Sequence, residues 1–138
     1  MRLGAGIGVL MTRPPNGIRV AERRRAMPKF ITIGYGDQAG YDRTPVHIRE
    51  TAHAADAKRT EAGDVMGVAG SPVQVRNAEA KGTEVIPGAF LSADLPIAGF
   101  ALVEAADLDE AISIAAQSPC AVAHGVVEIW PLEQVNVV

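Results

Sequence analysis

The chain has 138 residues, of which 48% are hydrophobic and 21% charged, a composition that favours one folded domain with a packed core over disorder. The formal net charge is −3, and the acidic balance after residue 26 repels phosphate backbones, which argues against a nucleic-acid partner. No apolar run approaches the roughly 18 residues of a membrane span, and the single cysteine, Cys120, excludes an intrachain disulfide, so we expect no membrane association and a cytoplasmic protein.

Residues 1–26 differ from the rest. They hold six arginines and one acidic residue, together with several glycines and a Pro-Pro-Asn-Gly turn signal. A secretory signal would need a clearer apolar core and a small-residue cleavage site. Two interpretations stay open: a basic arm for an anionic surface, or a poorly ordered extension ahead of a domain at residues 27–135. We favour the extension, because termini that are not tied into a core are usually loose.

The first half of this domain predicts a strand and a helix. Residues 29–35 alternate and are β-branched, which predicts a strand, and residues 36–43 predict a loop. Thr44 and Pro45 are typical of an N-cap followed by proline at the first helical position, and Gly63 is suited to end that helix. Its apolar stripe, Ile48, Ala52, Ala55 and Ala62, is made of small side chains, so we expect it to lie close to a sheet.

The second half predicts a hairpin and a second strand–helix–strand unit. Asp107 and Glu110 have the spacing of a capping box at the start of a helix. The expected elements are a strand at 64–69, a hairpin at 73–77 and 83–86, a strand at 99–104, a helix at 107–117 and a strand at 125–132. This order predicts an α+β, ferredoxin-like βαβ(β)βαβ fold, in which two helices cover one face of an antiparallel sheet.

Alternation along the strands makes both faces of the predicted sheet apolar. Two helices can cover only one of them, and a bare face of this size exceeds what monomers usually expose. We therefore expect a two-fold homodimer. The alternative, in which residues 1–26 cover the second face, is disfavoured because that segment is rich in arginine and glycine.

Two stretches resemble a known family. Residues 99–111 read GFALVEAADLDEA, and residues 125–131 read GVVEIWP after a Ser-Pro-Cys turn. Over residues 27–132 the chain resembles the YCII-related domain family, especially its DGPF branch. The resemblance implies a ferredoxin-like fold of the dimeric α/β-barrel kind, with a cleft between sheet faces. It also implies a family of mostly unassigned function, in which some relatives are proposed to be lyase- or dehalogenase-like enzymes and others occur beside sigma factors.

The chain departs from that family at two motifs. The Asp-Gly-Pro-Phe motif falls on residues 87–90, which read PGAF, and the arginine of the closing strand is replaced by Trp130. The glycine and Phe90 are kept, but any chemistry that depends on the aspartate or the arginine does not carry over.

Two pairs of side chains suggest acid–base or nucleophilic chemistry. His53 and Asp56 are three residues apart on the first helix, where the wider family has a proposed His–carboxylate pair and His47 is also near; an exposed polar surface is the interpretation we favour. Cys120 and His124, four residues apart, have the residue types of a nucleophile and its base. The alanines between them favour a cysteine that acts as a small hydrophobe.

Our preferred constellation lies on the sheet face that would meet the partner. There we expect Phe30, Thr32, Glu128 and Trp130, a carboxylate among aromatic rings whose pKa could be raised. A Glu128 that is hydrogen-bonded across the dimer is the favoured alternative. The candidate ligand-pocket residues are Phe30, Thr32, His53, Phe90, Glu128 and Trp130.

We find neither metal-ligand spacing among the three histidines nor a phosphate-binding glycine motif, so we expect no metal and no cofactor. The sequence favours a homodimer that binds a small organic ligand without chemistry. The alternative is a cofactor-independent lyase- or isomerase-type enzyme.

Overall fold

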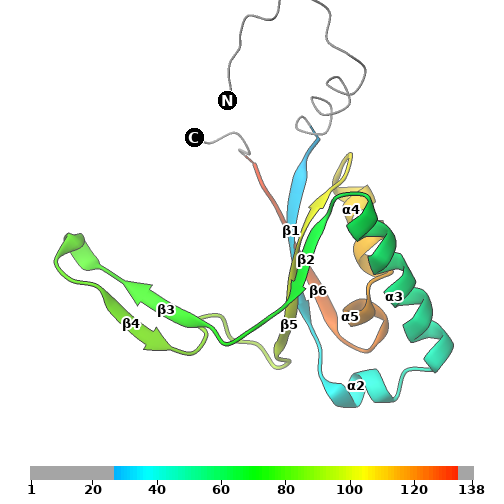
Figure 1. The fold of residues 1–138 in the computed structure, drawn as a ribbon, viewed down its shortest axis with the longest axis horizontal. Helices are drawn as coiled ribbons and strands as arrows, with labels where there is room; N and C mark the ends of the chain where they lie inside the picture. Colours follow the sequence, from blue (N-terminus) through cyan, green and yellow to red (C-terminus); the bar gives the residue numbers. More distant parts are fainter. Residues whose placement is uncertain (1–26, 134–138) are drawn as a thin grey trace, which may run out of the picture.

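The computed structural model describes residues 27–133 and shows an α+β fold (Figure 1). The predictions for residues 1–26 lie outside the described residues. The elements, in chain order, are β1 (Lys29–Tyr35), α2 (Gln38–Asp42), α3 (Val46–Glu61), β2 (Val65–Val68), β3 (Val73–Arg76), η2 (Ala78–Ala80), β4 (Glu84–Pro87), β5 (Ile97–Glu104), α4 (Leu108–Ala116), α5 (Pro119–Val122) and β6 (Val126–Pro131).

Four strands form an antiparallel sheet in the order β2-β5-β1-β6. The helices α3, α4 and α5 all lie on one side of this sheet (Figure 1). The α+β, ferredoxin-like prediction is therefore confirmed. No helix among the described residues is both long enough and apolar enough to cross a membrane.

The core lies between the sheet and α4. Phe30 on β1 and Val103 on β5 face each other across the strand pair and are only 4% and 3% exposed. They pack against Ala105 and Ala111, whose small side chains let α4 approach the sheet closely. Burying a phenylalanine of this kind contributes roughly 1.5–3 kcal/mol.

The start of α4 is held by the two predicted residues, although Glu110 binds the backbone N–H of Ala106 rather than that of the N-cap Asp107. The Asp107 carboxylate accepts a hydrogen bond from the Glu110 backbone N–H at 2.8 Å, and the Glu110 carboxylate accepts one from the Ala106 N–H at 2.6 Å. Two backbone donors at the helix end are thus satisfied by side chains.

The segment between β1 and α3 differs from the prediction. The expected loop at residues 36–43 contains the short helix α2, because the Asp37 carboxylate caps it by accepting from the Gly40 N–H at 2.8 Å. Pro45 is the N-cap of α3 rather than its first residue, while the Thr44 hydroxyl donates to the Gly40 carbonyl at 2.8 Å. Gly63 follows the end of α3 with φ 111°, as a helix-ending glycine should.

The strands β3 and β4 form a separate two-stranded sheet. We call residues 73–87 the arm, because they project away from the four-stranded sheet on the side opposite the helices (Figure 1). The predicted hairpin is therefore confirmed, but as a projection that the sequence did not indicate.

The second face of the four-stranded sheet carries no helix, and we call it the open face. Register places Leu102 and Trp130 beside Ile31, and Phe100 and Glu128 beside Ile33, all on this face. Its exposed large apolar side chains are Val65, Phe100, Val126 and Trp130. The prediction that both faces are largely apolar is confirmed.

Candidate functional site

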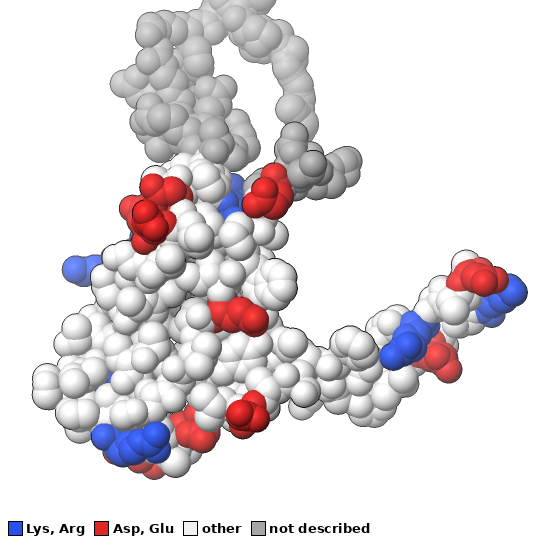
Figure 2. All heavy atoms as spheres, turned by 180° about the vertical axis from the view of Figure 1, so that it is seen from behind, with Lys and Arg blue, Asp and Glu red and all other residues white. Residues whose placement is uncertain are grey.

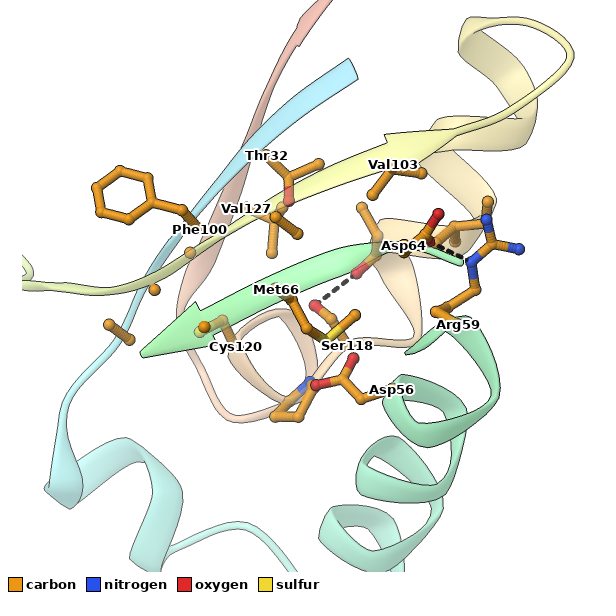
Figure 3. A pocket seen from close by; sticks show the side chains of 18 of the residues that line it. Thr32, Asp56, Arg59, Asp64, Met66, Phe100, Val103, Ser118, Cys120 and Val127 are labelled. Atoms are coloured by element: carbon orange, nitrogen blue, oxygen red, sulfur yellow. Dashed lines mark hydrogen bonds and ion pairs between the residues drawn. The ribbon is translucent and has the colours of Figure 1, made fainter. Parts of the chain in front are cut away.

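A cavity of about 370 Å³ lies between α3, α5 and the helix-covered face of the sheet (Figure 3). Its sheet wall consists mostly of apolar side chains from β2, β5 and β6, including Met66, Val103 and Val127. A pocket of this volume and apolar character is typical of small-molecule sites.

Glycines in the cavity wall let the surrounding elements pack closely. A Cβ added at Gly34 would lie 2.8 Å from the Cys120 sulfur, and one added at Gly99 would lie 2.5 Å from the Gly67 carbonyl oxygen. Glycine at these two positions therefore lets α5 sit against β1 and lets β2 and β5 approach each other. With Ala101 beside them, the sheet presents a shallow surface under α3.

Asp56 on α3 is the polar group that defines the cavity. Its side chain points into the space between α3 and α5 (Figure 3). Burial raises the pKa of this carboxyl, while the neighbouring His53 acts in the opposite direction. Among the described residues, no hydrogen bond or ion pair reaches the Asp56 carboxylate. The cavity thus contains a half-buried carboxylate without a partner.

The expectation that His53 and Asp56 lie on an exposed polar flank is wrong for Asp56. Ala52 is 2% exposed on the side of α3 that packs toward α5, the main contact of this helix, and Asp56, one turn later, lies on the same side and lines the cavity. The expected close approach of this helix to the sheet is therefore wrong, because the cavity lies between them. Ile48, at the start of the predicted stripe, is 36% exposed. The helix is therefore rotated about its axis relative to the prediction. Its apolar stripe consists largely of alanines, whose small side chains gain little from burial and so favour one orientation only weakly.

His53 borders the same cavity at its exposed rim. A hydrogen bond of 2.9 Å joins its Nε2 to the Tyr41 hydroxyl, and the Arg49 guanidinium lies 4.6 Å from the centre of the Tyr41 ring. The sequence did not indicate this contact, since Tyr41 lies in the segment that was expected to be a loop. The contact fixes the orientation of the imidazole beside Asp56.

The Arg59–Asp64 pair also lines the cavity but is already satisfied. Arg59 Nε donates to the Asp64 carboxylate at 2.6 Å, and Arg59 Nη2 donates to the Glu104 carbonyl at 3.0 Å. Asp64 is 6% exposed and accepts a second bond from the Glu104 N–H at 3.2 Å. This network ties the end of α3 to β5, so we assign it a structural role.

Cys120 lies at the floor of the cavity and is partly buried. Burial raises the pKa of its thiol, and the negative charge of Asp56 raises it further. A protonated thiol is a poor nucleophile. His124 is exposed, and within the described residues no hydrogen bond links it to Cys120. The geometry therefore gives no support to a nucleophile–base pair.

The preferred constellation on one sheet face is wrong. Phe30 and Thr32 lie on the helix-covered face, whereas Glu128 and Trp130 lie on the open face, because the register pairs Ile33 with Glu128. Residues that pair directly across a ladder share a face.

Glu128 has a partner within its own chain. It accepts a hydrogen bond from the Tyr35 hydroxyl at 2.9 Å, which raises the pKa of that tyrosine. The predicted bond across the dimer is therefore not needed to satisfy Glu128.

Two of the six candidate residues, Thr32 and His53, line the cavity. Phe30 is part of the core, and Phe90 follows the arm with 80% of its surface exposed. Asp56 joins Thr32 and His53 in the cavity, and ligand binding by these side chains stays a prediction. Within residues 27–133 no group of three His, Cys, Asp or Glu side chains could hold a metal ion.

The chain was compared with models of protein families and with the curated proteins. The model of a family described as YCII-related domain matches residues 29–136, a span that begins with β1 and includes every strand and helix described above. A search of the curated proteins finds no match.

Proposed function

Because the chain belongs to the YCII-related domain family, we propose that it is a small homodimeric domain that binds a small organic molecule in the cavity beside α3. The observation that carries the proposal is the Asp56 carboxylate, which accepts no hydrogen bond and forms no ion pair among the described residues and lines a mostly apolar cavity. A carboxylate that is partly removed from water and accepts no hydrogen bond from the protein is available to accept one from a ligand.

The cavity suits a ligand with an apolar body and one hydrogen-bond donor. Met66, Val103 and Val127 would contact the body, and the Asp56 carboxylate would accept from the donor. A protonated amine fits best, since charge-assisted hydrogen bonds are stronger than neutral ones. Arg59 is held by Asp64 and Glu104, so an anionic ligand finds no free cation there.

Benzylamine, a ring with an ammonium group, is a suitable probe. We expect it to shift the backbone NMR signals of Thr32, Asp56 and Cys120 in the ¹⁵N-labelled protein. Asp56→Asn should weaken this binding at least about tenfold, the equivalent of about 1.4 kcal/mol. Glu50→Gln, on an exposed part of the same helix, is the matched control and should leave it unchanged. Equal binding to parent and Asp56→Asn protein would refute the role of Asp56.

Acid–base catalysis is the second candidate, favoured by the convergence of His53, Asp56 and Cys120 on one cavity. A carboxyl with a raised pKa can donate a proton at a higher pH than an ordinary aspartate. The test is to identify by mass spectrometry any compound that co-purifies with the protein from its own host. Conversion of that compound by the parent but not by Asp56→Asn would establish an enzyme, and binding without conversion would leave the binding function.

The homodimer is proposed from the open face, where Phe100 and Trp130 remain about half exposed. Sedimentation velocity at micromolar concentration should show a particle of twice the 14.5 kDa chain mass. A chain that starts at Met27 should dimerise equally well. Monomer alone in the full chain, with a dimer formed only by the shorter chain, would show that residues 1–26 cover the open face instead.

A further inference from the structure

We propose that the arm is a dimer clasp, in which the apolar stripe of each arm packs against the open face of a second copy of this chain. The proposal rests on the homodimer proposed above and specifies how the second copy is held. It is carried by the two faces of the arm, by the side on which the arm leaves the sheet, and by the apolar area that a stable dimer needs.

The arm is amphipathic. Its ladder pairs Val73 with Pro87 and Val75 with Val85, so these four side chains share one face. The three valines are 61%, 63% and 60% exposed. A two-stranded hairpin is marginally stable in water unless an apolar face is packed on another element. The main contacts of β3 and β4 are with each other, so this stripe has no cover within the described chain.

The other face of the arm is satisfied locally. The Arg76 guanidinium lies 5.9 Å from the centre of the Phe90 ring, and the Gln74 amide donates to the Gly88 carbonyl at 3.3 Å. At the tip, Lys81 and Glu79 form an exposed ion pair at 3.1 Å. This face also carries Ile86, which pairs with Gln74 and is 39% exposed, but its other side chains are polar, so the stripe is the more apolar of the two faces.

The arm leaves the sheet on the side of the open face, opposite the helices (Figure 1). A second copy seated on the open face would therefore lie alongside the arm. Charged side chains gather toward the far end of the arm, while the part near the sheet carries none (Figure 2). The uncharged part is the part that a second copy would cover.

The arm would enlarge the contact that the open face can make. Four exposed apolar side chains of the open face, Phe100, Trp130, Val65 and Val126, contribute roughly 200–400 Å² of that contact. A stable interface buries about 800 Å² on each partner. The arm supplies the additional area, and two-fold symmetry uses each arm once.

The first test adds one negative charge to either face of the arm. Val75→Glu should raise the dimer dissociation constant at least about 100-fold, because a carboxylate on the stripe would be buried against the partner. Gln74→Glu, the neighbouring residue on the other face of the arm, is the matched control and should change the dissociation constant less than about threefold. Equal effects of the two variants, or no effect of Val75→Glu on a persistent dimer, would overturn the clasp and leave the dimer proposal intact.

The second test locates the arm without disturbing the stripe. A spin label on Lys81→Cys in a Cys120→Ala background places the probe at the exposed tip of the arm. The spin-labelled protein is made without ¹⁵N and is mixed with ¹⁵N-labelled protein that carries no spin label. Only a spin label on the other copy of a dimer can then broaden the observed signals.

We expect the signals of open-face residues in the ¹⁵N-labelled copy to broaden. A spin label on Glu61→Cys, at the end of α3, is the control and should leave those signals sharp. A dimer whose open-face signals stay sharp overturns the clasp, and a monomer at all concentrations overturns both the clasp and the dimer.

Discussion

The four-stranded sheet and the arm are both antiparallel and rich in valine, yet they differ in what covers their apolar side chains. Val103 in the sheet is 3% exposed because α4 lies over it, whereas Val75 in the arm is 63% exposed. The alternating pattern alone produces a strand in both places. The comparison shows that alternation specifies the strand, while burial depends on a second element, which the arm lacks within residues 27–133.

The same contrast holds for the ion pairs. We call the four-stranded sheet and its helices the body. Asp64 in the body is buried and accepts bonds from both Arg59 and the Glu104 backbone. Lys81 and Glu79 at the tip of the arm are each more than three-quarters exposed. A buried charge depends on its partner, whereas an exposed pair contributes little. Matched substitutions in the two regions therefore measure how far the arm differs from the body.

The largest effect should come from replacing aromatic rings. Phe30→Ala should lower the free energy of unfolding by about 3–5 kcal/mol, because it leaves a cavity under α4. Phe90→Ala, beside the arm, should lower it by less than about 1 kcal/mol. Urea denaturation followed by circular dichroism at one protein concentration gives both values. Equal losses would show that the arm region is as tightly packed as the core.

The ion pairs should give the next largest difference. Arg59→Met should cost about 2–3 kcal/mol, since it leaves Asp64 buried without its cation, although water can reach the partly exposed arginine site. Lys81→Met should cost no more than about 0.5 kcal/mol. The double variant Arg59→Met/Asp64→Leu should recover part of the first loss. If it is less stable than Arg59→Met alone, the cost does not come from the unpaired Asp64 charge.

Helix and turn caps should differ less. Asp107→Ala removes the N-cap of α4 and should cost about 1 kcal/mol. Asn77→Ala removes an acceptor for the Gly82 N–H in the loop of the arm at 3.1 Å. Water can replace that exposed bond, so we expect a loss of less than about 0.5 kcal/mol. A thermal melt of each variant against the parent measures the difference, and a larger effect at Asn77 would contradict it.

Local signals in the sequence predicted much of this fold. Residues 29–35 form β1 as predicted, Gly63 follows the end of α3, and Asp107 with Glu110 caps α4. Each of these depends on the chemistry of a few neighbouring residues, such as an alternating β-branched run, a positive φ or a side-chain acceptor at a helix end. They need no knowledge of distant contacts.

The candidate site was harder to predict because it depends on how elements meet. Each strand's two faces follow from alternation, but a change of one residue in register exchanges them. Since both faces of β1 and β6 are apolar, the sequence could not indicate that Thr32 and Glu128 lie on opposite sides. The rotation of α3 was equally undetermined, because alanines such as Ala52 and Ala55 distinguish its faces weakly.

The smallest predicted effect is a change in stability with pH that comes from Asp56. Asp56 accepts no hydrogen bond among the described residues, whereas Asp64, the other carboxylate of the cavity, is bound by Arg59 and the Glu104 backbone. Burial raises the pKa of Asp56 above its ordinary 3.8. The folded protein therefore binds the proton more tightly than the unfolded chain, and stability falls as pH rises through the range above 3.8. Asp56→Asn should remove this loss and stabilise the protein at neutral pH by less than about 1 kcal/mol, because a half-exposed group is screened.

Urea denaturation of the parent and Asp56→Asn between pH 3.5 and pH 7 checks this prediction, since the range begins near the ordinary pKa of aspartate, about 3.9, and extends above it. The two stabilities should converge at the acidic end and separate as pH rises, whereas Glu50→Gln should follow the parent throughout. If Asp56→Asn is instead the less stable protein at neutral pH, the carboxylate has a partner in solution. The cavity would then lack the unpaired acceptor on which ligand binding is argued.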